Sequence, residues 1–289
     1  MSSKFDWDAL SKNLNENAMS DGNKKTYEVD ERFYRLSRDE NGNGGALIRF
    51  IPDSNGVPFI KMTRIDAQQG KNKPFVSEWS PQTIGKPDPF NERFSELWNS
   101  GQQEEAKKYG RKFRYLTNIK VIKDPQNKDN EGKTFLFDMS PTLFEKIKNA
   151  ASPSESEIAL GAEPMEVYNP VEGNSFLLKV KLGSNGFLTY EDSKFADKVD
   201  GIYKSDAEAT KDIKENAYNL DEFLKPESFL SYDELKQKLA WFEGKKEETS
   251  VPTEDKPETA EKTAEPQKET PKAEPADDEL DDLLDELLD

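Results

Sequence analysis

Residues 107–123 read Lys-Lys-Tyr-Gly-Arg-Lys-Phe-Arg-Tyr-Leu-Thr-Asn-Ile-Lys-Val-Ile-Lys. The second half of this stretch, Phe113–Ile122, is rich in β-branched and aromatic residues and predicts a strand. A turn at Asp124-Pro125 leads to Thr134–Phe137, which we expect to be the returning strand. Because side chains alternate along a strand, one face should carry Phe113, Tyr115, Thr117 and Ile119 and the other Arg114, Leu116, Asn118 and Lys120.

The same stretch is strongly basic. It holds seven Lys and Arg residues and no acidic one, whereas the whole chain has 41 basic and 58 acidic residues. Tyr109, Phe113 and Tyr115 lie among these cations. Cations for phosphates together with rings for bases are what a single-stranded nucleic acid requires of a groove. Lysines on a strand edge also serve to prevent unwanted pairing, so the stretch alone leaves both interpretations open.

Composition narrows the possible classes of function. The chain has no cysteine and no histidine, which excludes disulfides, Cys- or His-based metal sites and a histidine general base. An enzyme would have to work with carboxylates, Lys or Tyr. The first residues have no apolar signal core, and no run reaches the roughly 18 apolar residues of a membrane span. We therefore expect a soluble, intracellular protein.

The net charge of −17 is unevenly distributed along the chain. Residues 244–289 contain 6 basic and 17 acidic residues, a net charge of −11, which leaves −6 for residues 1–243. Prolines recur between residues 244 and 276 with almost no apolar side chains, so this linker should be disordered. The final residues, 277–289, form an acidic tail that either docks a partner or only solubilises the chain. Five leucines at helical spacing favour partner docking: Leu280, Leu283, Leu284, Leu287 and Leu288.

The remaining sequence predicts a mainly β fold with helical insertions. Residues 1–25 should be an N-terminal arm and residues 26–243 the folded core. Strands are expected at Ala46–Ile51, Val57–Thr63, Phe176–Leu182 and Phe187–Tyr190, and helices at Asn91–Trp98, after Ser140-Pro141 and after Ser231. Prolines between residues 70 and 89 exclude a regular central strand, and residues 151–164 should be a loop. An oligonucleotide-binding (OB) barrel is the small β-fold that best suits a basic, aromatic face.

Several phrases of the sequence resemble one family. They are Asn-Gly-Asn-Gly-Gly-Ala-Leu-Ile-Arg-Phe-Ile-Pro (41–52), Asn-Ile-Lys-Val-Ile-Lys-Asp-Pro (118–125), Asn-Glu-Gly-Lys-Thr-Phe (130–135), Asn-Pro-Val-Glu-Gly-Asn-Ser-Phe-Leu-Leu-Lys-Val-Lys (169–181) and Gly-Phe-x-x-Tyr-Glu-Asp-Ser-Lys-Phe (186–195). With the Asp/Leu tail, they make the chain similar to the single-stranded DNA-binding proteins of T-even phages. The resemblance implies a non-enzymatic OB-fold protein that coats unpaired DNA cooperatively during replication, recombination and repair, in the cytoplasm of the infected bacterial host. It also implies that the tail covers the DNA groove and recruits a polymerase, a helicase loader and a recombination mediator.

The resemblance also assigns DNA-contacting residues. Matching positions are Arg49, Arg111, Lys112, Tyr115, Phe187 and Tyr190, and Phe137 occupies a family tyrosine position. The basic stretch itself adds Lys107, Lys108, Tyr109 and Arg114 as candidates.

The chain departs from the family in two places. The family's zinc module needs one His and three Cys, so no zinc or other cofactor is expected here. The corresponding subdomain should instead be held by packing, with Phe75, Trp79, Phe90, Phe94 and Trp98 as candidates. The arm keeps only Ser2-Ser3-Lys4 of the family's basic cluster, which argues against strong self-association along DNA by that route.

Two rival functions come from other classes. Plentiful acidic residues suit a carboxylate-dependent nuclease, although the folded part has no compact Asp-x-Asp pattern in a convincing context. The overall acidity also suits a scaffold that contacts only proteins.

Overall fold

The computed structural model describes residues 30–70, 73–183, 188–199 and 201–245. The chain divides into two units, residues 1–247 and 248–289, and the second lies wholly outside the described part. The predictions for the arm, the acidic tail and all but the first residues of the linker therefore fall outside the described residues and stay predictions.

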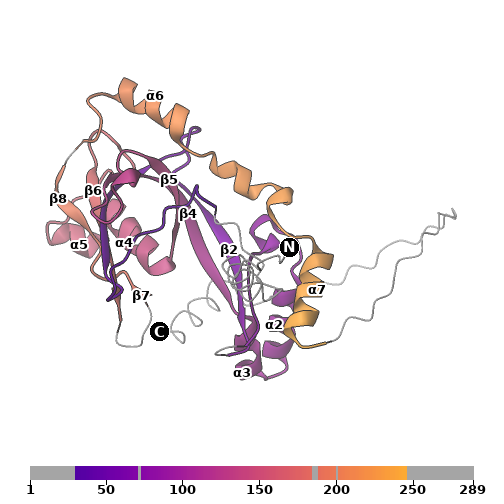
Figure 1. The fold of residues 1–289 in the computed structure, drawn as a ribbon. Coiled ribbons are helices and arrows are strands. Elements are labelled where there is room, and N and C mark those ends of the chain that lie inside the picture. Colours follow the sequence, from indigo (N-terminus) through magenta and orange to yellow (C-terminus); the bar gives the residue numbers. More distant parts are fainter. Residues whose placement is uncertain (1–29, 71–72, 184–187, 200, 246–289) are drawn as a thin grey trace, which may run out of the picture. The chain divides into compact units, whose positions relative to one another are not determined.

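One long strand, β4 (Arg111–Lys123), organises the sheet. Along one edge its first half pairs with β2 (Phe59–Gln68) and its second half with β1 (Gly44–Ile51), while β5 (Thr134–Met139) pairs along the other edge. All three pairings are antiparallel. Because β4 spans two strands that follow each other end to end, the sheet curls into a half-barrel, which is consistent with the expected OB-like core (Figure 1).

The remaining strands extend the sheet on both sides. The strand order is β3-β2-β4-β1-β6-β7, with β8 paired to β6. The bounds are Phe75–Trp79 for β3, Asn174–Leu182 for β6, Leu188–Thr189 for β7 and Lys194–Val199 for β8. The strand β3 lies at the sheet edge and contains no proline, so the proline-rich segment does exclude a central strand. Neither β3 nor β8 was predicted from the sequence.

The two faces of β4 pack into different hydrophobic clusters, as the alternation predicts. Ile119 faces an inner cluster with Phe137 and Met139, which also includes Leu143 and Ile147 of α4 (Pro141–Ala151). Leu116 faces an outer cluster with Ile60, Met62 and Leu136, which is covered by η4 (Leu220–Leu224) and by Phe229 after η5 (Pro226–Ser228). Burying both faces fixes the register, because a slip by one residue would exchange the two sets of side chains.

Local signals set the helix ends. Ser140 caps α4, accepting a hydrogen bond from the Leu143 amide, and the Ser231/Glu234 capping box begins α7 (Tyr232–Phe242). The expectation of a loop over residues 151–164 is wrong in part, because a second capping box at Ser154 begins the short helix α5 (Glu155–Ala159). The helix α6 (Asp206–Asn216) was not predicted.

A helical subdomain lies at one end of β2 and β4 (Figure 1). It comprises η1 (Pro81–Ile84), α2 (Pro89–Asn99), α3 (Gln103–Ala106), η2 (Lys107–Tyr109) and α7. Packed rings occupy its interior: Phe94 stacks on Trp98 at 5.6 Å and Phe90 meets Phe242 edge-on at 6.0 Å. The packing role predicted for Phe75 is wrong, since this side chain is 59% exposed, and Trp79 packs instead against the outer cluster.

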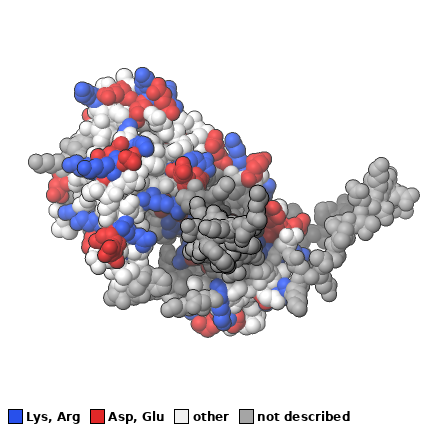
Figure 2. All heavy atoms as spheres, in the orientation of Figure 1, with Lys and Arg blue, Asp and Glu red and all other residues white. Residues whose placement is uncertain are grey.

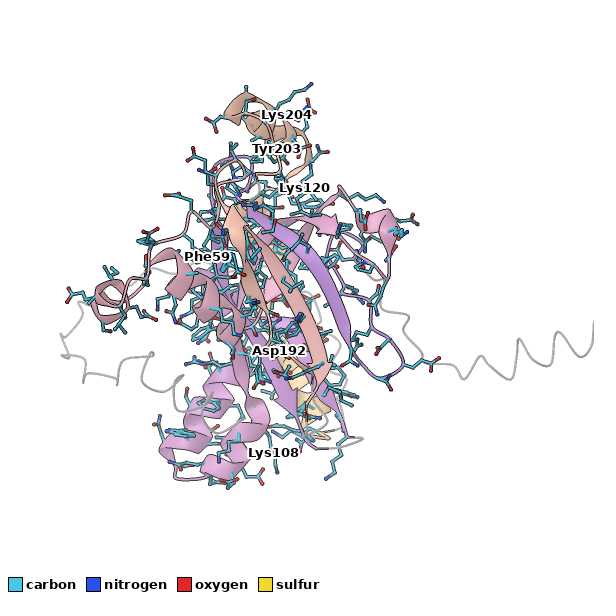
Figure 3. All side chains as sticks on the ribbon, turned by 90° about the vertical axis from the view of Figure 1, so that its left-hand side faces the viewer. Phe59, Lys108, Lys120, Asp192, Tyr203 and Lys204 are labelled. Carbon is cyan, nitrogen blue, oxygen red and sulfur yellow. The ribbon has the colours of Figure 1, made fainter. Side chains whose placement is uncertain are left out.

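A charged cluster fastens α6 to the other end of β4. The Lys120 ammonium lies 2.5 Å from a carboxylate oxygen of Asp212 and 5.0 Å from the centre of the Tyr203 ring. The Tyr203 hydroxyl donates to the same carboxylate. Figure 3 shows Lys120 and Tyr203 together at one end of the sheet and Lys108 of the helical subdomain at the other. Within the described ranges, no helix is long and apolar enough to cross a membrane.

Candidate nucleic-acid interface

A cleft of about 590 Å³ lies where four segments of the chain meet. These are the segment 30–38, the paired strands β2 and β3, the end of β5, and β7 with the residue after it. We call this cleft the groove. Its basic residues are Arg35, Arg38 and Arg64, and its aromatic residues are Phe33, Tyr34, Trp79, Phe137 and Tyr190.

Backbone pairing brings these distant residues together. Arg64 lies directly opposite Trp79 in the β2–β3 ladder, with its guanidinium 5.5 Å from the centre of the indole ring. The Arg64 Nε–H donates to Ser77 Oγ at 2.8 Å, which holds the guanidinium in place. The segment before β1 follows β5, because the Tyr34 amide donates to the Leu136 carbonyl at 2.8 Å. Arg35 and Arg38 thereby reach the groove from the opposite side.

The acidic side chains of the groove each have a basic partner. Asp138 lies between two arginines, with its carboxylate 2.7 Å from Arg114 Nε and 3.5 Å from Arg64 Nη1. Glu78 pairs with Lys238 outside the groove, and Asp30 pairs with Arg32 at 2.7 Å.

Arg35 and Arg38 are exposed, and none of the carboxylates in the described residues lies within ion-pair distance of either. Figure 2 shows basic and acidic side chains interspersed over the described part of one face. The groove lining itself holds three arginines and three acidic residues, and Arg35 and Arg38 are the two of these arginines without a carboxylate of the described residues at ion-pair distance.

The aromatic hydroxyls in the groove stay neutral. Burial raises the pKa of Tyr190, although the nearby Arg114 and Arg38 lower it in part. Burial and a hydrogen bond to Asp124, at 3.0 Å, raise the pKa of Tyr34. Both side chains thus present uncharged rings over the physiological range.

Three residues predicted from the sequence meet at the groove. Tyr190 lines it, Arg114 contacts it through the Asp138 carboxylate, and Phe137 borders it from the inner cluster with only 6% of the residue exposed. Lys112 lies on the same face of β4 as Arg114 and pairs with Asp66 at 3.0 Å.

Two predicted residues lie on the opposite face of β4. The Tyr115 ring stacks on Phe144 with centroids 3.7 Å apart and planes 4° apart. Arg111 donates to Asn91 Oδ1 at 3.0 Å and to Gln82 Oε1 at 3.3 Å, both in the helical subdomain. Strand alternation places the two outside the groove.

Two further predicted residues are buried. The Arg49 side chain has an exposed fraction of 0% and donates to the Asn169 carbonyl and to Ser175 Oγ, both at 3.5 Å. Tyr109 is 7% exposed, donates to Glu243 and packs on Phe242.

The last predicted residues are either paired within one helical turn or not described. Lys107 pairs with Glu104 at 2.9 Å and Lys108 with Glu105 at 2.7 Å. Phe187 and the five tail leucines lie outside the described residues.

The sequence did not single out Arg35, Arg38 and Arg64 as a group, and it suggested Trp79 only for packing. They are far apart in the chain, and only the β2–β3 pairing and the path of residues 30–38 bring them together. The sequence gives no clear signal for Arg35 and Arg38, because the acidic Asp39 and Glu40 follow Arg38 directly.

A curled antiparallel half-barrel with a groove of arginines and rings is the arrangement of an OB-like nucleic-acid-binding protein. The chain belongs to the family described as "gp32 DNA binding protein like", which residues 42–242 match. It is 32% identical over 228 residues to the single-stranded DNA-binding protein of Enterobacteria phage T4, covering 77% of this chain and 73% of that protein. It is also 32% identical over 229 residues to the single-stranded DNA-binding protein of Enterobacteria phage T2, covering 76% and 72%.

Proposed function

We propose that this protein binds single-stranded DNA in the groove. The observation that carries the proposal is the convergence of Arg35, Arg38 and Arg64 with Trp79 and Tyr190 around one cleft. The names of the T4 and T2 relatives support the same class of ligand. Arg114 and Lys112, on the same face of β4, extend the cationic surface. Arg49 and Tyr109 are not part of the proposed contacts, because their buried side chains cannot reach a phosphate or base without rearrangement.

The two kinds of side chain contribute differently. Arginines neutralise phosphates and release counterions, so binding should weaken steeply as salt rises. Rings that stack on bases contribute roughly 1–3 kcal/mol per base with little sequence preference. Duplex DNA keeps its base faces covered, so only unpaired strands gain the stacking contribution. Binding therefore favours strand opening without a nucleotide cofactor.

Tryptophan fluorescence tests the site. Binding of oligo(dT) should quench the wild-type emission, and Trp79→Phe should remove most of that change. Trp241→Phe is the matched control, because Trp241 is 57% exposed on α7 and does not line the groove. Tyr190→Ala should weaken binding about 5- to 150-fold, which corresponds to the stacking contribution of roughly 1–3 kcal/mol. Equal affinity of wild type and Tyr190→Ala for oligo(dT), or equal wild-type affinity for single- and double-stranded DNA, contradicts the proposal.

The wider role is also a proposal. We infer that the protein coats unpaired DNA during replication, recombination and repair in the infected host cell, associating with further copies along the strand. Its acidic tail would recruit replication proteins through Leu280, Leu283, Leu284, Leu287 and Leu288. The family membership and the leucine spacing support this role.

The two rival functions make different predictions. A carboxylate-dependent nuclease would cleave labelled single strands in the presence of Mg²⁺, whereas we expect binding without cleavage. In the described part of the chain, no group of three or more His, Cys, Asp or Glu side chains could hold a metal ion. An acidic scaffold that contacts only proteins would retain no DNA in a filter-binding assay.

A further inference from the structure

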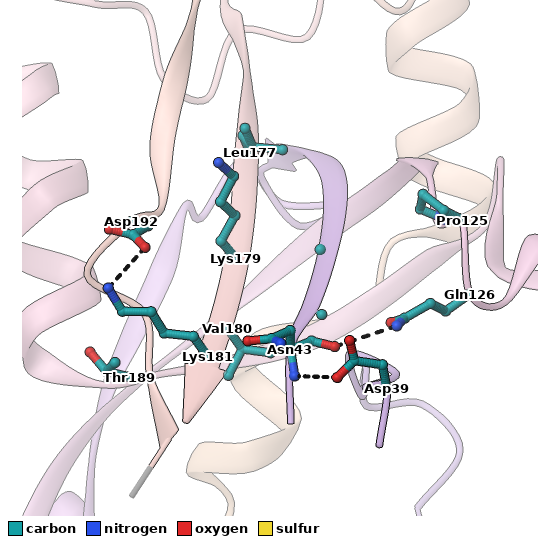
Figure 4. A pocket seen from close by; sticks show the side chains of 12 residues that line it. Asp39, Asn43, Pro125, Gln126, Leu177, Lys179, Val180, Lys181, Thr189 and Asp192 are labelled. Carbon is teal, nitrogen blue, oxygen red and sulfur yellow. Dashed lines mark hydrogen bonds and ion pairs between the residues drawn. The ribbon is translucent and has the colours of Figure 1, made fainter. Parts of the chain in front are cut away.

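A second cavity, of about 490 Å³, lies against β1 and β6 (Figure 4). The two spaces share a wall formed by β7 and the residues around it. Leu188 and Tyr190 line the groove, while Thr189 and Asp192 line the cavity. The segment before β1 divides in the same way, because Arg38 lines the groove and its neighbour Asp39 lines the cavity. The two spaces therefore lie on either side of the same two segments, so a strand that passes over this wall goes from one to the other.

The floor of the cavity is bare backbone with apolar neighbours. Gly44 and Gly45 of β1 line it, Gly45 with room at its Cα and Gly44 packed against the Ser37 carbonyl, and Leu177 of β6 and Pro125 add apolar surface. A ligand can approach a backbone closely where glycine leaves no side chain in the way. This floor suits a flat, largely apolar group such as a nucleobase.

Two lysines supply the charge. Lys179 and Lys181 are alternate residues of β6 and so lie on the same face of that strand (Figure 4). Lys181 pairs with Asp192 at 3.0 Å, but the two side chains are 44% and 56% exposed, so the pair is weak and a phosphate can replace the carboxylate. Lys179 is exposed, and no carboxylate of the described chain lies within ion-pair distance of it.

We propose that this cavity binds a further nucleotide of the same single strand that occupies the groove. The base lies on the glycine backbone between Leu177 and Pro125, and Lys179 and Lys181 bind the adjoining phosphate. The two lysines and the wall shared with the groove select this occupant, and of the two carboxylates in the lining, Asp39 and Asp192, the phosphate would replace Asp192 on Lys181. The inference rests on the proposed function, since it extends the path of the same DNA strand.

Two substitutions test the cavity. Gly45→Leu should fill it without backbone strain, because a Cβ at Gly45 would meet only the Leu178 carbonyl oxygen, at 3.7 Å. Lys179→Ala removes one phosphate contact, and Lys214→Ala on α6 is the control for loss of a single exposed lysine. Thermal melting of each variant reports whether it folds, and if Gly45→Leu does not, Lys179→Ala and its control decide.

Affinity is measured for an oligo(dT) series of about 4 to 16 nucleotides, the range of site sizes for OB folds. Both variants should bind the shortest oligonucleotides like the wild type and the longer ones about 3- to 10-fold more weakly. For long oligonucleotides, the slope of the logarithm of the binding constant against the logarithm of the salt concentration should be smaller in magnitude by about 0.7 for Lys179→Ala, the value for one phosphate of a single strand.

Two results distinguish failure of this inference from failure of the proposed function. If both cavity variants match the wild type at every length, the cavity does not bind the strand, while Tyr190→Ala still tests the groove independently. If Lys179→Ala instead weakens binding of an acidic tail peptide and leaves every DNA length unchanged, the occupant is a protein segment and the inference is overturned.

Discussion

Substituting Asp138, an acidic residue of the groove, tests whether the groove arginines bind DNA phosphates. The Asp138 carboxylate contacts Arg114 at 2.7 Å and Arg64 at 3.5 Å, so it occupies the place where a DNA phosphate would meet both arginines. We predict that Asp138→Asn tightens binding of single-stranded DNA, because the incoming phosphate no longer competes with a fixed anion. The fold should be retained, since Arg114 Nη2 also donates to the Asp138 main-chain carbonyl, at 3.0 Å.

The magnitude follows from the exposure of the three side chains. Asp138, Arg114 and Arg64 are 20%, 24% and 38% exposed, so water screens each ion pair only in part. At about 0.5–1 kcal/mol for each pair, the two together oppose DNA binding by about 1–2 kcal/mol. This free energy corresponds to roughly 5- to 30-fold in affinity at low salt, and the gain should shrink as salt rises.

Fluorescence anisotropy of labelled oligo(dT), at two salt concentrations, measures the effect. Asp233→Asn, on the exposed first turn of α7, makes the same change in net charge away from the groove and should leave the affinity within about twofold. Weaker binding by Asp138→Asn would refute the reasoning, because Asp138 would then be holding the arginines in their binding geometry.

Four other predictions concern the tail, the α6 contact, the core and the subdomain. Truncation after Gly244 removes most of a segment with a net charge of −11 and should tighten binding at low salt, whereas a loss of affinity would exclude shielding of the groove by the tail. Burial raises the pKa of Asp212, but the hydrogen bonds from Lys120 and Tyr203 outweigh it, so the pKa lies below the ordinary 3.8. The ionised Asp212 carboxylate therefore stabilises the folded state above pH 3.8, and this stabilisation is lost as pH falls through the lowered pKa. In urea titrations at decreasing pH, the unfolding free energy of Asp212→Asn should fall less than that of the wild type. Tyr34→Phe removes the hydroxyl that donates to the buried Asp124 carboxylate, and it should lower the free energy of unfolding in urea titrations by about 1–3 kcal/mol. An unchanged urea midpoint would show that the hydrogen bonds from Asn127 and Asn130 are enough to satisfy this carboxylate. Metal analysis should find no stoichiometric zinc, and a chelator should leave the melting temperature unchanged, because the chain has no His or Cys and Phe90, Phe94 and Phe242 pack inside the subdomain.

Local patterns predicted the central part of the fold. The β-branched and aromatic run at 113–122 marked β4, the turn at Asp124-Pro125 marked its return to β5, and alternation assigned both faces of β4 correctly. Ser140 and Ser231 marked helix starts because their hydroxyls accept hydrogen bonds from amides three residues later. Such contacts lie within one turn or one strand pair, so sequence spacing contains them. The edge strand β3 was missed because it is short and surrounded by prolines.

The candidate site could be predicted only in part. Tyr190, Phe137 and Arg114 were identified, but alternation along β4 divides the basic stretch between two faces, and the sequence does not say which face forms the groove. Arg49 was assigned to DNA contact by the family resemblance alone. In the structure residues 169–175 cover it, and a Cβ on Gly173 would lie 2.7 Å from its guanidinium.

The strand at residues 113–122, the helix starts and the acidic character of residues 244–289 follow from the sequence alone, because these features depend on neighbours in the chain. Only the tertiary structure decided which cations and rings share a groove. Along the chain, Arg38, Arg64, Trp79 and Tyr190 are each separated from the next by 15 to 111 residues. Their convergence depends on long-range strand pairing and on burial, neither of which sequence spacing encodes.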